Sequence, residues 1–260
     1  MSEQRLGGEL AIVTGSDSGI GRATAIAFAE EGADIIVTYR HDRQGAENTA
    51  REIEAVGRKA SVFALDQRDS GNVRQLFQDV KSAAGVPTIL VNNAGIDALG
   101  KVVKDMTDDD WDETIRTNLH GPFYCCREFI RTIDGSGRHG SIINITSVHQ
   151  EIPRAGASAY DASKGGLRNL TTTLALEVAE KNINVNNIAP GMVLTPMNQS
   201  AIDDPDVYRQ QVQSIPMKRA AQPAEIAYAA VFLASEQARY IHGTTIFVDG
   251  ALMLFQGQGA

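Results

Sequence analysis

The chain is poor in cysteine. Its only two cysteines among 260 residues, Cys125 and Cys126, are adjacent. A disulfide between adjacent residues is geometrically awkward, so the sequence excludes a framework of structural disulfides. Such cysteine usage is typical of a reducing compartment, and we expect a cytoplasmic protein.

The chain also lacks a basic excess and any long apolar run. Its 24 Lys and Arg residues face 32 Asp and Glu residues, which gives a formal net charge of −8. This charge disfavours a nucleic-acid or anionic-membrane surface. No stretch is long enough to cross a bilayer, and Met1–Gly8 is polar without a signal-peptide core. We expect a small molecule as partner, with no nucleic acid and no membrane.

Short β-rich apolar runs alternate with longer amphipathic stretches, and no linker separates them. This alternation is typical of an α/β fold in which parallel strands form a doubly wound sheet with helices on both faces. One domain over residues 1–260 accounts for it. The expected strands are Leu10–Thr14, Asp34–Tyr39, Ser61–Leu65, Thr88–Val91, Gly140–Thr146, Asn184–Ile188 and Thr245–Val248; the expected helices are Ile20–Glu31, Gln44–Val56, Val73–Ala83, Thr107–Ile133, Ala157–Lys181 and Ala224–Ser235.

The alternation weakens between Met192 and Met217. Polar residues there mix with Pro196, Pro205 and Pro216. Such a stretch is too long for an ordinary connection between two elements. We expect it to form a substrate lid over about residues 192–217.

The first expected strand runs into a glycine-rich turn, Gly15-Ser-Asp-Ser-Gly19-Ile-Gly21, and a helix follows directly. Glycines let the backbone approach a pyrophosphate, whose charge the helix N-terminus then meets. The spacing differs from the usual G-x-G-x-x-G pattern. A dinucleotide site is the favoured interpretation, and a tight strand-to-helix connection is the alternative.

The end of the second expected strand carries Arg40 where NAD sites usually place an acidic residue. Arg40, together with Ser16 on the glycine turn, is suited to a 2′-phosphate. The sequence therefore predicts NADP as cofactor, with NAD also accepted. An ordinary solvated arginine is the alternative.

The tract from Ser147 to Lys164 holds the strongest catalytic candidates. Tyr160 and Lys164 are four residues apart, so a helix places them on one face. A nearby cation lowers the pKa of a phenol, which can then exchange protons with an alcohol or a carbonyl. The alternative for the pair alone is a surface helix that carries both residues by coincidence.

The motifs Thr14-Gly-x-x-x-Gly-x-Gly21, Asn92-Asn-Ala-Gly95, Ser147, Tyr160-x-x-x-Lys164 and Pro190-Gly191, in this order, closely resemble the short-chain dehydrogenase/reductase family. The resemblance covers essentially residues 7–250. It implies a single Rossmann-type domain with a seven-stranded parallel sheet. It also implies an oxidoreductase that transfers a hydride between a nicotinamide and an alcohol or carbonyl.

The resemblance implies a role for each matching residue. Tyr160 would be the general acid and base, Lys164 would lower its pKa, Ser147 would hold the substrate oxygen, and Asn118 would anchor a water leading protons to Lys164. No metal ligand is implied. With the glycine turn and Arg40, the predicted cofactor-binding residues are Gly15, Ser16, Gly19, Ile20, Gly21, Arg40, Asp66, Asn93, Ala94, Gly95, Tyr160, Lys164, Pro190, Gly191, Val193 and Thr195.

Within the family, the chain is most similar to bacterial glucose 1-dehydrogenases, above all in Ser147-Val-His-Gln-Glu-Ile-Pro153. This similarity implies a sugar substrate bound by Asp97, Ser147, His149 and Asn198. A surface loop histidine is the alternative for His149, and Asp97 stands where that subgroup has Glu. Two other functions stay open: a broad reductase of ketones, 3-oxoacyl thioesters or steroid-like alcohols, and a catalytically silent dinucleotide-sensing scaffold.

The apolar run 252–255 is expected to need cover from a neighbouring subunit. The family resemblance implies a homotetramer in which the helices near Thr107–Ile133 and Ala157–Lys181 pack against their mates. A tail folded back on its own domain is the alternative.

Overall fold

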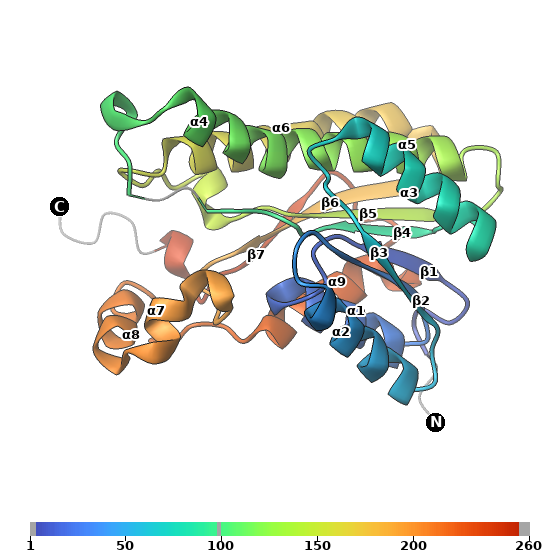
Figure 1. Cartoon of the computed structure of the whole chain (residues 1–260), viewed down its shortest axis with the longest axis horizontal. Helices are drawn as coiled ribbons and strands as arrows, with labels where there is room; N and C mark the ends of the chain where they lie inside the picture. Colours follow the sequence, from blue (N-terminus) through green and yellow to red (C-terminus); the bar gives the residue numbers. More distant parts are fainter. Residues whose placement is uncertain (1–3, 98–99, 255–260) are drawn as a thin grey trace.

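Seven parallel strands form one sheet in the order β3-β2-β1-β4-β5-β6-β7 (Figure 1). The computed structural model describes residues 4–97 and 100–254. It confirms the Rossmann-type doubly wound sheet, and each expected strand lies within two residues of its predicted bounds. The strands are β1 (Leu10–Val13), β2 (Asp34–Tyr39), β3 (Ala60–Ala64), β4 (Ile89–Asn92), β5 (Gly140–Ile145), β6 (Ile183–Pro190) and β7 (Thr245–Val248).

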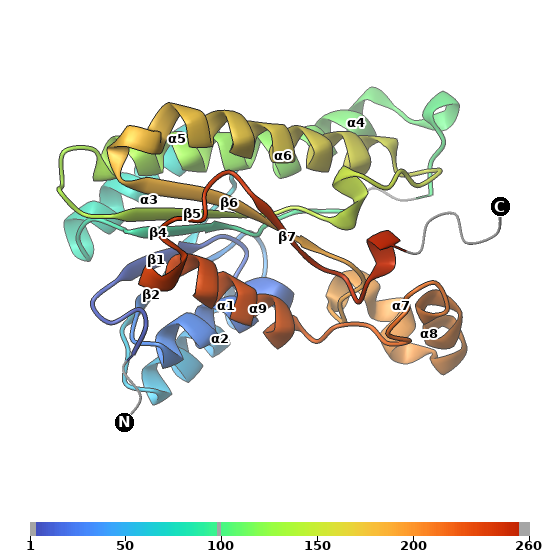
Figure 2. The same ribbon diagram turned by 180° about the vertical axis from the view of Figure 1, so that it is seen from behind.

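Helices cover both faces of the sheet, as Figures 1 and 2 show from opposite sides. Successive residues of a strand point to opposite faces, so the apolar run of β1 feeds two cores: Ala11 and Val13 join one, Leu10 and Ile12 the other. One face is covered by α1 (Gly19–Glu30), α2 (Arg43–Ala55) and α9 (Pro223–Ala234), and the other by α3 (Ser70–Ala83), α4 (Asp108–Ile115), α5 (Gly121–Ile133) and α6 (Ser158–Val178).

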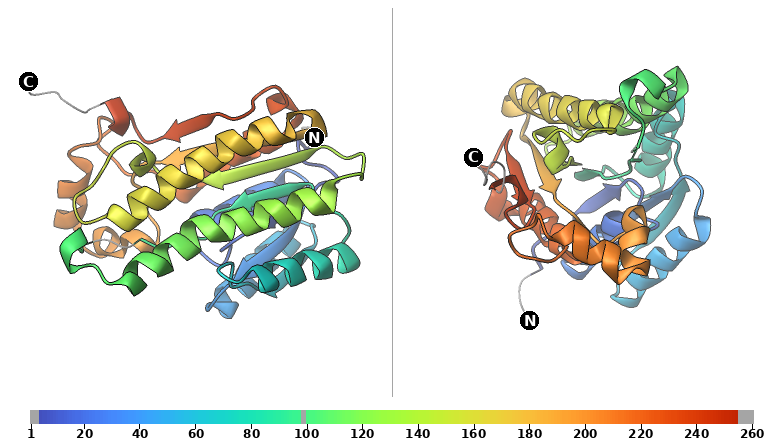
Figure 3. Two further views of the ribbon diagram at one scale, coloured as in Figure 1. Left: turned by 90° about the horizontal axis from the view of Figure 1, so that it is seen from above. Right: turned by 90° about the vertical axis from the view of Figure 1, so that its left-hand side faces the viewer.

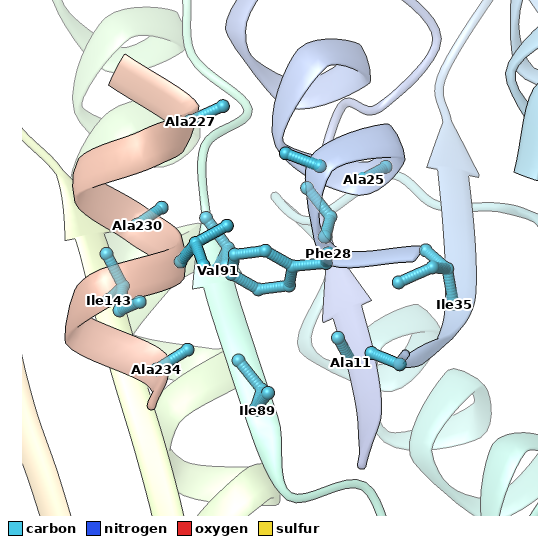
Figure 4. Close-up of a cluster of buried hydrophobic side chains, with 14 of the residues drawn as sticks. Ala11, Ala25, Phe28, Ile35, Ile89, Val91, Ile143, Ala227, Ala230 and Ala234 are labelled. Carbon is cyan, nitrogen blue, oxygen red and sulfur yellow. The ribbon is translucent and has the colours of Figure 1, made fainter. Parts of the chain in front are cut away.

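The core beneath α1 is built around the fully buried ring of Phe28. Figure 4 shows this ring directed toward Val91 of β4, between α1 and α9. Helix α9 presents Ala227, Ala230 and Ala234 on that side, and such small side chains let the helix lie close to the ring. This packing holds α1, whose N-terminus belongs to the glycine turn, against the sheet.

The expected continuous helix Thr107–Ile133 is divided in the structure. Helix α4 ends at Ile115, a π-helical turn occupies Arg116–His120, and α5 starts at Gly121. The backbone N–H of Gly121 donates to the carbonyl of Arg116, five residues back, which widens the helix locally. No proline or glycine stands inside the turn, but Gly121 and Pro122 follow it directly, and Pro122 lacks the N–H that a continuous helix would use.

The segment expected as a lid is helical rather than irregular. It contains a 3₁₀ turn at Pro196–Asn198 and the short helices α7 (Gln199–Asp203) and α8 (Pro205–Val212). Figures 1 and 3 show α7 and α8 beyond the carboxyl end of the sheet, outside its helical layers. Val212 and Ile215 form a small apolar cluster there with Ala220. The segment, called the cap below, is therefore an ordered helical unit and not a loose connection.

Both cysteines are free and buried. The Sγ of Cys126 accepts a hydrogen bond from the side chain of Asn92 at 3.2 Å, and burial raises the pKa of this thiol to about 12. Neither thiol is therefore ionised at neutral pH. Within residues 4–97 and 100–254, no helix combines the length and apolarity needed to cross a membrane.

Candidate active site

A cavity of about 500 Å³ opens at the carboxyl ends of the strands. It runs from the turn after β1 past the loop after β4 to Ser147, Tyr160 and Lys164. Chain order reverses between β1 and β4, and ligands of open α/β sheets bind at such a point. The fold thus brings the two predicted halves of the site, for cofactor and for catalysis, into one cavity.

The glycine turn fits a phosphate group. Gly19 lines the cavity with φ of +54°, a conformation that other residues rarely adopt, and it begins α1. Gly21 lies behind the wall, where a Cβ would stand 2.2 Å from the carbonyl oxygen of Gly15. The turn therefore packs tightly while leaving the N-terminus of α1 open to an anion.

Ser16 does not take the place predicted for it. Its side chain is completely buried, and its hydroxyl donates to the carbonyl of Val13 and accepts from the backbone N–H of Thr38. Because the hydroxyl bonds to Val13 of β1 and to Thr38 of β2, it is not available to a 2′-phosphate. The neighbours Asp17 and Ser18 line the cavity instead.

The loop after β4 is pinned to the glycine turn. The hydroxyl of Thr14 accepts from the backbone N–H groups of Asn93 and Ala94, at 2.9 and 3.0 Å. The side-chain amide of Asn93 donates back to the carbonyls of Thr14 and Gly15. Asn93, Ala94 and Gly95 all line the cavity, and these bonds fix the width of its mouth.

Asn118 lies in the π-helical turn and is almost fully buried. Its carboxamide pairs with the backbone of Ile96: the oxygen accepts from the N–H at 2.9 Å, and the nitrogen donates to the carbonyl at 2.8 Å. The same nitrogen also donates to the hydroxyl of Ser163 at 3.2 Å. The side chain thus anchors the loop after β4 to α6. The predicted water beside Lys164 stays a prediction.

Ser147 and Tyr160 both line the wall of the cavity. Burial raises the pKa of Tyr160 above its usual value, hydrogen bonding with the Ser147 side chain opposes this rise, and the carboxylate of Asp97 adds to it. The sequence predicts a lowered pKa, so the structure corrects that expectation. The physical reason is that burial outweighs the other influences on the phenol.

Lys164 is buried one helical turn from Tyr160, as the spacing predicts. Its Nζ lies 5.6 Å from the centre of the Tyr160 ring and donates to the carbonyl of Ile145 at 2.9 Å. Removal from water penalises the charged form and lowers the pKa of Lys164 to about 8. The cation therefore persists at neutral pH but is easily discharged above it.

A cluster of charged side chains lies at the far end of the cavity, and the sequence predicts only some of its members. Arg40 and Asp66 line it as predicted, and Arg68 lines it as well. The guanidinium of Arg68 grips the carboxylate of Asp66 through Nε and Nη2, at 2.9 and 2.6 Å, and thereby holds the pKa of Asp66 below its usual value. Arg68 follows Asp66, the acid at the end of β3, by two residues, and this closeness in sequence could have identified Arg68 as a candidate.

The predicted residues near the nicotinamide end are gathered at the cavity wall, with one exception. Asp97 and Asn198 line the cavity, whereas His149 is not part of its lining as described. The Nδ1 of His149 lies 2.9 Å from the carbonyl oxygen of Ile152, and its ring packs edge-on against Tyr160. His149 therefore packs against the Tyr160 ring and does not line the cavity. The other residues predicted for this end, Pro190, Gly191, Val193 and Thr195, also line the cavity.

Comparison with known proteins extends over nearly the whole chain. Residues 15–252 match a family model described as enoyl-(acyl carrier protein) reductase. The 3β-hydroxysteroid dehydrogenase 1 of Eggerthella lenta is 40% identical over 97% of this chain and 96% of its own length. Glucose 1-dehydrogenase 2 of Bacillus subtilis is 37% identical over 97% of this chain and 98% of its own length.

A solved structure gives the same result. The gluconate 5-dehydrogenase from Burkholderia cenocepacia, in complex with NADP and tartrate, is 35% identical and superposes with a TM-score of 0.90. The superposition covers 97% of this chain and 98% of that one. The fold, the cavity and these matches agree. The chain belongs to the short-chain dehydrogenase/reductase family of NAD(P)-dependent oxidoreductases.

Proposed function

We propose that this protein is an NADP-dependent dehydrogenase of a sugar, similar to glucose 1-dehydrogenase. The observation that carries the proposal is the carboxylate of Asp97, which lines the cavity near enough to Tyr160 to raise its pKa. A carboxylate in a substrate site accepts hydrogen bonds from hydroxyl groups and is costly to bury against an apolar molecule. Asn198 lines the same region and adds a polar group.

The proposed reaction places each residue at a stated atom. Ser147 holds the oxygen of the reacting carbinol, and the phenolic oxygen of Tyr160 takes the proton from it. This step requires Tyr160 as its phenolate, which Lys164, charged at neutral pH, stabilises before the proton is taken. A bound nicotinamide would supply the hydride acceptor. In the reverse direction, burial keeps Tyr160 protonated and ready to act as the acid.

We propose that residues 1–260 act as one catalytic domain and that the cap carrying α7 and α8 is its substrate lid. Five residues that begin this segment, 193 and 195–198, line the cavity. Exclusion of water by such a cap strengthens the electrostatic interactions at the reacting atoms.

A second candidate substrate is a hydroxysteroid or another apolar carbonyl compound, including a 3-oxoacyl thioester. Two observations favour it: the identity with a 3β-hydroxysteroid dehydrogenase, and the apolar side chains of Ile96, Val193 and Met197 in the cavity wall. A catalytically silent scaffold is the remaining candidate.

A substrate panel separates these functions. Purified protein is assayed by nicotinamide absorbance against aldoses, polyols, 3β-hydroxysteroids, ketones and 3-oxoacyl thioesters, with NAD and NADP in parallel. We expect the highest kcat/KM with an aldose and NADP. A higher value with a steroid or thioester contradicts the sugar proposal, and no turnover of any substrate favours the scaffold.

Exchanging Arg40 for Asp tests the cofactor. Arg40 lines the adenosine end of the cavity. We expect Arg40→Asp to raise KM for NADP by about 10- to 100-fold, because the new carboxylate repels a 2′-phosphate that the guanidinium would attract. KM for NAD should change much less. Arg43→Asp is the matched control, since Arg43 is highly exposed and pairs with Glu47 on α2. Equal changes with both nucleotides would remove Arg40 from this role.

We further propose a cytoplasmic homotetramer. Phe123 of α5 and Leu176 of α6 are exposed to 42% and 84%, and exposed apolar side chains on adjacent helices are suited to a subunit contact. Leu252–Leu254 forms a single 3₁₀ turn with Leu254 exposed, and residue 255 of the apolar tail lies outside the described residues. Sedimentation equilibrium should find four chains per particle, and a monomer would contradict this assembly.

A further inference from the structure

The charged group at the adenosine end includes a carboxylate from outside the cavity lining. Glu113 comes from the last turn of α4 and is about half exposed. Its Oε1 lies 3.8 Å from Nη1 of Arg40 and 3.3 Å from Nη1 of Arg68. One carboxylate thus faces both guanidinium groups that line this end of the cavity.

The two arginines are held differently. Arg68 donates several hydrogen bonds to Asp66 and one, at 3.3 Å, to Glu113, so Asp66 is the main partner that fixes its position. Arg40 lies 3.8 Å from Asp66 and 3.8 Å from Glu113, and both separations exceed hydrogen-bonding distance. Glu113 therefore reduces the positive potential around Arg40 without fixing the orientation of its side chain.

We propose that Glu113 is a specificity-determining residue that restrains the preference for NADP over NAD by partly neutralising Arg40. The inference rests on the proposed use of NADP. Two arginines and two carboxylates in this group cancel in formal charge, and the carboxylates of Asp17 and Asp42 also line the cavity. A 2′-phosphate entering here meets a weaker cation than Arg40 would be alone, whereas the uncharged 2′-hydroxyl of NAD is barely affected.

The test is direct binding of NADP and NAD to the full chain by isothermal titration calorimetry, without substrate. We expect Glu113→Gln to lower Kd for NADP by roughly three- to tenfold and to leave Kd for NAD within about twofold. The gain should shrink at about 0.5 M salt, since the interaction acts across a partly exposed surface. In an Arg40→Ala background the gain should also fall.

Asp112→Asn is the matched control. Asp112 is the preceding residue of α4, its removal changes the net charge equally, and its carboxylate faces Arg116 at 3.6 Å. We expect both Kd values to stay unchanged. Weaker NADP binding in Glu113→Gln, an equal shift for both nucleotides, or the same gain in Asp112→Asn would each overturn the inference. If the unaltered protein bound NAD but not NADP, the proposed cofactor would fail instead, and this inference with it.

Discussion

Replacing Tyr160 with Phe should lower kcat by about 10²- to 10⁴-fold while leaving Kd for NADP within about twofold. The substitution removes only the hydroxyl that we propose exchanges the proton, and the ring keeps its packing against His149. Steady-state kinetics with the best substrate of the panel measures kcat, and calorimetry measures Kd for NADP.

Tyr240→Phe provides the control, because Tyr240 is fully exposed and lies outside the cavity lining. It should retain the original kcat. If Tyr160→Phe kept a tenth or more of the turnover, another group would have to move the proton. If it instead lost the cofactor, the side chain would serve binding and not chemistry.

Replacing Lys164 with Met should remove turnover and stabilise the fold at neutral pH. Burial lowers the pKa of Lys164 from 10.5 to about 8, so the folded state is penalised for holding the charge. This shift corresponds to roughly 3 kcal/mol, and loss of the hydrogen bond to the carbonyl of Ile145 offsets about 1 kcal/mol of it. A net gain of about 2 kcal/mol is expected at pH 7.

The stability gain expected for Lys164→Met depends on pH, whereas a gain from better packing would not. Below about pH 8 the lysine is charged in both folded and unfolded states, and the whole penalty is present. Between about pH 8 and 10.5 the folded form is neutral while the unfolded form is still charged, so the penalty declines and then vanishes. The stability advantage of Lys164→Met should therefore disappear toward pH 10.5.

Urea unfolding of the unaltered protein and of Lys164→Met, at pH 7 and at about pH 10, measures the difference in their free energies of unfolding. Other groups that titrate equally in the two proteins do not affect this difference. Lys181→Met is the control, since the Lys181 side chain is 42% exposed and pairs with Asp134. It should change stability by less than about 1 kcal/mol at either pH. A Lys164→Met variant that is less stable at pH 7, or whose advantage is the same at both pH values, would contradict the expected origin of the effect.

The sheet could be predicted because its signal is local and repeated. Strands buried on both faces read as short apolar runs, and the glycines after Val13 and the small residues after Asn92 mark two strand ends directly. Tyr160 and Lys164 could be paired because helical spacing alone places them together. The parallel strand arrangement then brings these features together at the carboxyl ends of the strands.

The remaining features depend on tertiary contacts that no local pattern carries. Ser16 is turned inward because two backbone groups of neighbouring strands claim its hydroxyl. The His149 ring is held by the carbonyl of Ile152 and by the Tyr160 ring. Its position in the sequence therefore could not show which way the side chain points. Glu113 meets Arg40 only after α4 has packed beside the sheet, and a separation of 73 positions hides the pair.

The π-helical turn has a consequence for the rotational phase of the helix that contains it. A regular α-helix advances by about 100° per residue, and the turn from Arg116 to His120 accommodates one residue more than regular winding would. That surplus sets the direction in which Asn118 leaves the axis. Shortening the segment by one residue would rotate α4 relative to α5 and turn Asn118 away from Ile96. The extra residue of the π-helical turn thus directs Asn118 toward Ile96, and this contact anchors the loop after β4.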